Sequence, residues 1–169
     1  KRTMSKLAPI YNTNRMVRQY AERFYVNAAA RWEKLTANDM AETRNLAAWK
    51  TRFRQNFSSM RVESVTDDMA GRGAQVGRDI LIEAIIDTGA IEPKDILVEL
   101  YHGPLDDDGQ LHTGQAIEMQ LAAAMENRKV KYTVAMPCTR SGMTGYTVRV
   151  LPHHPDMADP RDMGLVRWV

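Results

Sequence analysis

Cysteine is almost absent from this chain: Cys138 is the single one among 169 residues, so no disulfide can form within the chain. Disulfides stabilise small domains mainly in oxidising compartments, so the scarcity favours a reducing, cytoplasmic setting. A lone thiol can be a nucleophile. Cys138 lies between Pro137 and Thr139 near the end of an expected strand, and we interpret it as structural.

Long apolar runs are also lacking. The longest, near Ile80–Ile86, is interrupted by Glu83 and is far shorter than the roughly 20 residues that cross a bilayer. The basic residues 1–6 precede no apolar segment, so no signal peptide is predicted. Because the chain has no initiator methionine, we expect it to begin inside a longer protein. Its 44% apolar and 26% charged residues are typical of a globular protein with a packed core and no membrane partner.

The sequence has no nucleophile elbow, no glycine loop that cradles phosphate before a helix, and no paired His/Cys signature. Gly71, Gly73 and Gly77 are too loosely spaced for a phosphate loop and precede a strand, so they predict a turn. Nothing in the pattern favours any two carboxylates as a glycosidase pair. We therefore assign no catalytic, cofactor-binding or metal-binding residue in this chain.

The histidines and one acidic run were considered as metal ligands. His153 and His154 are adjacent, so their side chains point in opposite directions on an extended backbone and do not readily chelate one ion. Asp106-Asp107-Asp108-Gly109 resembles a calcium loop, but an EF-hand has an acid at its twelfth position, where this chain has Ile117. A polar turn is the better interpretation of this run.

Charge divides the chain into two segments. Residues 1–57 carry 12 Lys/Arg and 4 Asp/Glu, a net charge of +8, and residues 58–169 carry 11 and 17, a net charge of −6. Such asymmetry suggests two segments with different partners.

Residues 12–57 have a helical pattern. Asn12-Thr13-Asn14 offers capping side chains before an apolar stripe at helical spacing: Met16, Val17, Tyr20, Ala21, Phe24, Tyr25 and Ala28. Residues 36–39 break the pattern, and a second helix is expected over 40–57. Two helices joined by a short turn predict an αα-hairpin.

After Ser58 the pattern changes to that of β-strands. Six strands are expected, over residues 60–65, 79–86, 96–101, 115–125, 131–136 and 146–151. The segment 115–125 is ambiguous, because Leu121–Met125 favours a helix, but its neighbours and the short connection favour a strand. Turns rich in Gly, Pro and Asp separate the strands, without a clear intervening helix.

The predicted fold class is therefore α+β: an N-terminal helical hairpin followed by an antiparallel, immunoglobulin-like β-sandwich. The change of pattern divides the chain into a helical segment, residues 1–58, and a β-sandwich, residues 59–169. The family resemblance given below implies that the first segment closes an upstream catalytic body and that the second is an accessory domain.

Basic residues on the helices raise a nucleic-acid surface as one hypothesis: Arg15, Arg18, Arg23, Arg31, Arg44, Arg52 and Arg54. Helices that belong to a larger enzyme would instead pair these arginines with acidic neighbours elsewhere in that protein. The family resemblance described next favours this second interpretation, and we expect no nucleic-acid partner.

Several motifs in order resemble one family. The segment 145–156 and the end 163–169 resemble the extreme C-terminus of the bacterial and archaeal α-glucan (glycogen or starch) phosphorylases. Leu7–Tyr25 is similar to the segment where such chains leave the second Rossmann-like domain, Asn45–Lys50 to the closing helices, and Leu97–Leu105 to a β-domain appended after the catalytic body.

The resemblance implies that the parent protein is a glycosyltransferase. Such enzymes use pyridoxal phosphate and inorganic phosphate to release glucose 1-phosphate from α-1,4-glucan. Their cofactor lysine and phosphate-binding residues lie upstream, so the resemblance carries no functional residue onto this chain. The expected partners of this segment are the upstream catalytic domains of the same chain.

The remaining question is whether the β-domain binds glucan. Sugar-binding sandwiches use exposed aromatics, and this region has only Tyr101, Tyr132, Tyr146 and Trp168. Strand alternation puts Ile96, Val98 and Leu100 on the expected core face and leaves Tyr101 beside Glu99 on the other. We therefore expect a structural or assembly role without catalysis, with a carbohydrate-binding module as the alternative.

Overall fold

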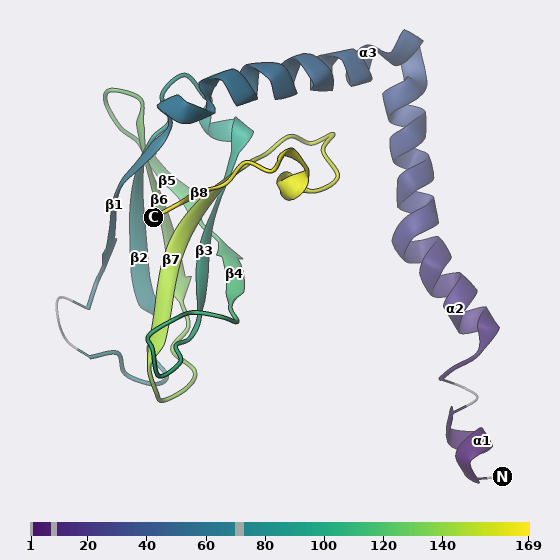
Figure 1. Ribbon diagram of the computed structural model, residues 1–169, viewed down its shortest axis with the longest axis horizontal. Coiled ribbons are helices and arrows are strands. Elements are labelled where there is room, and N and C mark those ends of the chain that lie inside the picture. The colour runs from purple at the N-terminus through teal and green to yellow at the C-terminus, as the bar shows by residue number, and fades with distance from the viewer. Residues whose placement is uncertain (1, 8–9, 70–72) are drawn as a thin grey trace. The chain divides into compact units, whose positions relative to one another are not determined.

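The computed structural model describes residues 2–7, 10–69 and 73–169 (Figure 1). The contacts within the chain define two compact units, Lys1–Ala48 and Trp49–Val169. The glycine turn predicted at 71–77 lies partly outside the described residues.

Residues 13–56 are helical, as predicted, and a short helix that was not predicted, α1 (Arg2–Leu7), precedes them. The elements after it are α2 (Thr13–Tyr20), the π-helical turn η1 (Ala21–Tyr25) and α3 (Val26–Asn56). The side chain of Asn12 accepts a hydrogen bond from the Arg15 backbone N–H at 2.7 Å, which confirms the expected cap.

The predicted break is present inside α3. Asn38, Asp39 and Met40 all have left-handed backbone angles, with φ of 49°, 53° and 58°. Each such residue costs about 1 kcal/mol, and Asn and Asp tolerate the conformation best. Arg44 contributes an ion pair to Asp39 at 3.0 Å.

A packed helical hairpin is not observed. The apolar stripe before the break stays exposed, whereas Trp49 and Phe53 after the break are buried within the second unit. Two helices close into a hairpin by burying a shared apolar face. Here the apolar face of the second helix, at Trp49 and Phe53, packs within the second unit instead.

The second unit contains two antiparallel sheets of four strands each, with strand orders β1-β2-β6-β5 and β4-β3-β7-β8. The strands are β1 (Arg61–Asp67), β2 (Ile80–Asp87), β3 (Ile96–Pro104), β4 (Gln115–Glu118), β5 (Gln120–Ala124), β6 (Lys129–Met136), β7 (Thr144–Pro152) and β8 (Arg167–Trp168). Short 3₁₀ turns are η2 (Phe57–Ser59), η3 (Pro93–Asp95) and η4 (Pro160–Met163). Five of the six expected strands are confirmed as single strands, and β8 is additional.

The ambiguous segment 115–125 is extended but is not a single strand. It forms β4 in one sheet and β5 in the other, and Met119 between them is buried. The Met119 backbone N–H donates to the Val98 carbonyl oxygen at 2.8 Å. Burial of Met119 and this hydrogen bond hold the crossing point, so the chain changes sheet without a loop.

The arrangement is sandwich-like, because alternate residues of the strands are buried. On β3, Ile96, Val98 and Leu100 are at most 6% exposed, which confirms the predicted core face. The two sheets are also joined by a hydrogen bond, which the Tyr146 hydroxyl on β7 donates to Asp67 Oδ2 on β1 at 2.7 Å.

The last turns of α3 pack within this second unit. The Trp49 ring lies 5.1 Å from that of Phe53 and 4.8 Å from the imidazole of His154. His154 Nδ1 accepts the Asp156 backbone N–H at 3.1 Å. The compact unit therefore begins within α3, while the domain boundary at 58/59 stays a prediction from the change of sequence pattern.

None of the helices in the described ranges is long and apolar enough to cross a membrane.

Candidate functional site

One cluster of polar and aromatic side chains lies on the outward face of the β4-β3-β7-β8 sheet. Glu99 and Tyr101 come from β3, Arg149 from β7 and Trp168 from β8, and the register pairs Arg149 with both Glu99 and Trp168. Arg149 Nε donates to Glu99 Oε2 at 2.6 Å. The short strand β8, absent from the sequence prediction, is what brings Trp168 to this position.

The aromatic rings of Tyr101 and Trp168 cover the ion pair between Arg149 and Glu99. The guanidinium carbon of Arg149 lies 5.2 Å from the centre of the Tyr101 ring and 5.3 Å from that of Trp168, and the two rings meet edge-on at 5.8 Å. Only 15% of the Arg149 side chain and 17% of the Glu99 side chain are exposed. Trp168 itself is 46% exposed. The cluster therefore presents one accessible aromatic ring above a shielded ion pair.

Tyr101 is half-buried rather than an open platform. Its hydroxyl accepts the backbone N–H of Gly114 at 3.0 Å, and a Cβ on Gly114 would lie 2.8 Å from the ring. The expectation that Tyr101 lies on the face opposite the core is confirmed, but the exposed ring of the cluster is Trp168.

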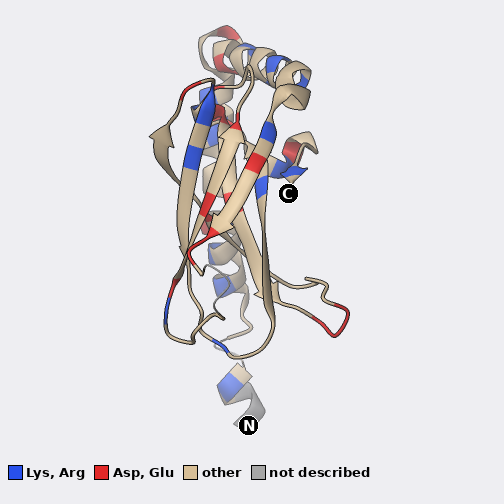
Figure 2. Cartoon of the chain, turned by 90° about the vertical axis from the view of Figure 1, so that its left-hand side faces the viewer, with Lys and Arg blue, Asp and Glu red and all other residues tan. Residues whose placement is uncertain are grey.

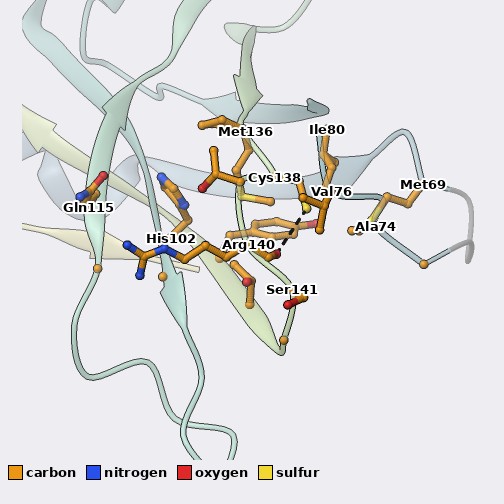
Figure 3. A pocket seen from close by; sticks show the side chains of 18 of the residues that line it. Met69, Ala74, Val76, Ile80, His102, Gln115, Met136, Cys138, Arg140 and Ser141 are labelled. Carbon is orange, nitrogen blue, oxygen red and sulfur yellow. Dashed lines mark hydrogen bonds between the residues drawn. The ribbon is translucent and has the colours of Figure 1, made fainter. Parts of the chain in front are cut away.

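A cavity of about 750 Å³ opens at one end of the sandwich (Figure 3). The ends of β3, β6 and β7 and the loops beside them form its walls. Its apolar floor includes Ile80 and Met136, which are buried, while Val76 at the rim is exposed. A volume of this size lies within the range of sites for small organic ligands.

The polar groups of the cavity include His102, Gln115, Arg140 and Tyr146. Burial, together with the hydrogen bond to Asp67, raises the pKa of Tyr146 to about 12, so its phenol is a neutral donor at ordinary pH. The Tyr146 hydroxyl already donates its hydrogen bond to Asp67. Its proton therefore links the two sheets and is not available to a ligand in the cavity.

Glycines allow the strands to approach closely at this end. A Cβ on Gly103 would lie 2.3 Å from the Thr113 carbonyl oxygen, and one on Gly145 would lie 2.5 Å from the Leu105 side chain. Side chains at these positions would force the strand ends apart and change the cavity wall.

The residues considered earlier as metal ligands are dispersed. His153 is exposed, the His154 ring packs at a tilt against Trp49, and His112 Nε2 lies 2.7 Å from Asp106 Oδ2. Asp106 Oδ1 accepts backbone N–H groups within its own loop, from Asp108 and Gln110, which confirms the polar turn. Across the described parts of the chain, no three His, Cys, Asp or Glu side chains are grouped as metal ligands.

Cys138 contributes to the wall of the end cavity. It is partly exposed, and its Sγ lies 4.0 Å from the Arg140 carbonyl oxygen, a weak contact. No sequence pattern predicts the cavity itself, because its walls come from strand ends and loops that are distant from one another in the chain.

Basic residues occur along the helices, and both basic and acidic residues occur on the strands (Figure 2). On neighbouring strands Lys129 pairs with Glu63 at 2.7 Å and Lys131 with Glu83 at 2.9 Å. The helical arginines Arg15, Arg18 and Arg23 are exposed.

Residues 57–169 match the family described as the glycogen phosphorylase C-terminal domain. The matched region covers more than half of the chain. The chain belongs to this family.

Curated relatives agree over nearly the full length. The maltodextrin phosphorylase of Thermococcus litoralis is 25% identical over 177 residues, covering 99% of this chain and 20% of the relative. The glycogen phosphorylases of Mycobacterium bovis and Mycobacterium tuberculosis are each 26% identical over 164 residues, covering 97% of this chain and 19% of the relative. The chain thus spans about a fifth of the length of the curated relatives it matches.

Proposed function

We propose that this chain is the non-catalytic C-terminal region of an α-glucan phosphorylase and serves a structural or assembly role. The parent protein would be a glycosyltransferase that releases glucose 1-phosphate from α-1,4-glucan with phosphate. Support comes from the family description and from relatives named as glycogen and maltodextrin phosphorylases. The single cysteine supports a cytoplasmic location.

The observation that carries the structural role is an exposed apolar stripe on the first helices. Tyr20, Phe24 and Tyr25 are 50%, 58% and 65% exposed, and their rings lie 5.6 to 6.3 Å apart. Trp32 is 68% exposed. A continuous aromatic face of this kind is typical of a surface that packs against more protein. The proposed partner is the upstream catalytic body of the same polypeptide, with no nucleic acid and no membrane.

Two measurements test this role. The 169-residue chain should release no glucose 1-phosphate from glycogen and phosphate, and sustained release would overturn the proposal. In the full-length protein, Phe24→Ala and Trp32→Ala should lower the thermal midpoint, because their rings would pack on the catalytic body. The same substitutions in the 169-residue chain should leave the midpoint unchanged. Equal changes of the thermal midpoint in both proteins, or no change in either, would contradict docking of the helices on the catalytic body.

Pyridoxal phosphate is the cofactor expected of the parent, and the lysines of the β unit do not fit it. A cofactor of this kind is held through a lysine amine in a site that orients its ring. In the β unit, Lys94, Lys129 and Lys131 are each paired with a glutamate on the surface. Among the described residues that line the end cavity there is no lysine. The proposed cofactor therefore belongs to the upstream body.

An immunoglobulin-like topology is the finer proposal for the sandwich. The first sheet, β1-β2-β6-β5, has the order A-B-E-D of an immunoglobulin domain. In the second sheet, β4-β3-β7-β8, strands β3 and β7 correspond to C and F, with β4 and β8 at the positions of C′ and G. The observed order β1-β2-β6-β5 beside β4-β3-β7-β8 supports this assignment. A relative solved experimentally, with strands paired in another order, would contradict it.

Carbohydrate binding is the alternative function, and Trp168 is the observation that favours it. An accessible indole beside buried charged groups is suited to stacking on a sugar ring while neighbouring polar groups bind hydroxyls. Affinity electrophoresis in a glycogen-containing gel should then retard the chain, and Trp168→Ala should abolish the retardation. Tyr11→Ala, which removes an aromatic that is 75% exposed on the helical segment, is the matched control. Unretarded migration of the wild-type chain would leave the structural role alone.

A further inference from the structure

The end cavity shares no lining residue with the cluster of Glu99, Tyr101, Arg149 and Trp168, and none with the helical segment. Its lining residues come from the second unit only, between Met69 and Tyr146. We propose that it binds a small organic oxyanion, a phosphate ester or a carboxylate carried on a compact ring. The proposal holds whether or not the parent is a glucan phosphorylase.

Charge is the first argument. The described residues that line the cavity include Arg140 and His102 but neither Asp nor Glu. This is unexpected in a segment, residues 58–169, whose net charge is −6. Asp67, the carboxylate in contact with the lining residue Tyr146, accepts a hydrogen bond from its hydroxyl at 2.7 Å. An anion entering the cavity would therefore meet a cation and hydrogen-bond donors without a facing carboxylate.

Availability of the donors is the second argument. Over the described residues, neither the Arg140 guanidinium nor the His102 imidazole makes an ion pair or a side-chain hydrogen bond. In Figure 3 the Arg140 side chain reaches across the cavity toward the strands that carry His102 and Gln115. A guanidinium fork binds phosphate or carboxylate oxygens in pairs, which gives both strength and orientation. Gln115 adds an amide donor from the edge strand β4.

The apolar floor is the third argument, and it implies more than a bare ion. Ile80 and Met136 are 5% and 4% exposed and pair with one another across β2 and β6. Val76, which is 59% exposed, stands at the rim. A ring that lies against these side chains would bury apolar surface and so gain affinity from the hydrophobic effect. The cavity thus combines an oxyanion end with an apolar end.

Titration calorimetry on the 169-residue chain tests this with three probes: phenyl phosphate, benzoate and inorganic phosphate. Saturable binding of phenyl phosphate but not of benzoate would identify the ligand class as a phosphate ester. Saturable binding of benzoate but not of phenyl phosphate would identify it as a carboxylate. Either result supports the proposal. Inorganic phosphate should bind more weakly than the better ring compound. Equal binding of inorganic phosphate, or no saturable binding of any probe, would overturn the proposal.

Variants locate the site. Arg140→Gln should weaken binding roughly tenfold to a hundredfold, since a charge-assisted hydrogen bond is lost. Arg161→Gln is the matched control: this exposed arginine pairs locally with Asp159 outside the cavity, and binding should not change. In the wild-type chain, the methyl resonances of Ile80 and Met136 should shift on titration with the ring compound. Unmoved methyl resonances, or binding insensitive to Arg140→Gln, would place the ligand elsewhere and refute the inference.

Discussion

The guanidinium of Arg149 meets the carboxylate of Glu99 at 2.6 Å across β7 and β3, beneath the exposed ring of Trp168. The pair lies on the outward face of its sheet, yet both side chains are more than four-fifths shielded from water. Strand register places the two charges opposite each other, and the C-terminal strand β8 covers them.

Replacing one member of this pair should destabilise the chain. Arg149→Met leaves the Glu99 carboxylate shielded without its partner and removes the contact with both rings. We expect a loss of about 2 kcal/mol in the free energy of unfolding, below the cost for a fully buried pair. Urea denaturation followed by tryptophan fluorescence measures it. Lys94→Met is the control: it breaks the equally short but exposed pair with Glu92 and should change nothing measurable. Equal losses in the two variants would contradict the role assigned to shielding.

Gly103 is expected to be essential for the close approach of the β3 end to the following loop. Gly103→Ala places a Cβ 2.3 Å from the Thr113 carbonyl oxygen, so backbone must move. We expect a loss of about 1–3 kcal/mol in stability, comparable to overpacking a core. Gly73→Ala should be neutral, because nothing lies within 4 Å of a Cβ there. Thermal unfolding of both variants gives the comparison, and a stable Gly103→Ala chain would show that the loop is free to yield.

The two tryptophans of α3 should behave differently in the 169-residue chain. Trp49 is 5% exposed and packs on Phe53 and His154, so Trp49→Ala should cost about 3–5 kcal/mol. Trp32 is 68% exposed, and Trp32→Ala should leave stability nearly unchanged. Chemical denaturation followed by circular dichroism measures both. A small effect at Trp49 would mean that the end of α3 does not belong to the compact β unit.

Alkaline pH should weaken the sandwich through Tyr146. Its pKa is raised from 10.0 to about 12, first by burial and then by the hydrogen bond to Asp67. A raised pKa means that the folded state favours the neutral phenol. The contribution of Tyr146 to folding stability is therefore fully present below pH 10 and is lost as the pH rises toward about 12. Tyr132, buried on β6, has a pKa raised to about 12 by burial and acts in the same direction.

The variant Tyr146→Phe separates this contribution. It should be less stable than wild type at neutral pH, because Asp67 loses its donor, and its stability should fall less steeply between about pH 10 and 12. Tyr11→Phe, at an exposed position, should reproduce the wild-type curve. Unfolding curves recorded across this pH range provide the measurement. An unchanged slope in Tyr146→Phe would exclude Tyr146 as the titrating group.

Local pattern predicted much of this fold. Alternation on β3 placed Ile96, Val98 and Leu100 in the core, and Asn12 was recognised as a helix cap. The split of residues 115–125 was missed, because alternation reports which face a residue occupies and not which sheet its strand joins. Strand β8 was missed because two residues are too short for a period. The helical hairpin was predicted from pattern alone, which does not specify what a helix packs against.

Sequence by itself determined the family, the single thiol, the division of charge and the period of each segment, because these depend on residue identity and spacing along the chain. Tertiary structure decided that Arg149 pairs with Glu99 and that Trp168 covers them. It also decided that Arg140 and His102 line one cavity whose described lining residues include no carboxylate. Such relationships join residues tens of positions apart. They follow from strand order and register, which only the packing of the whole unit specifies.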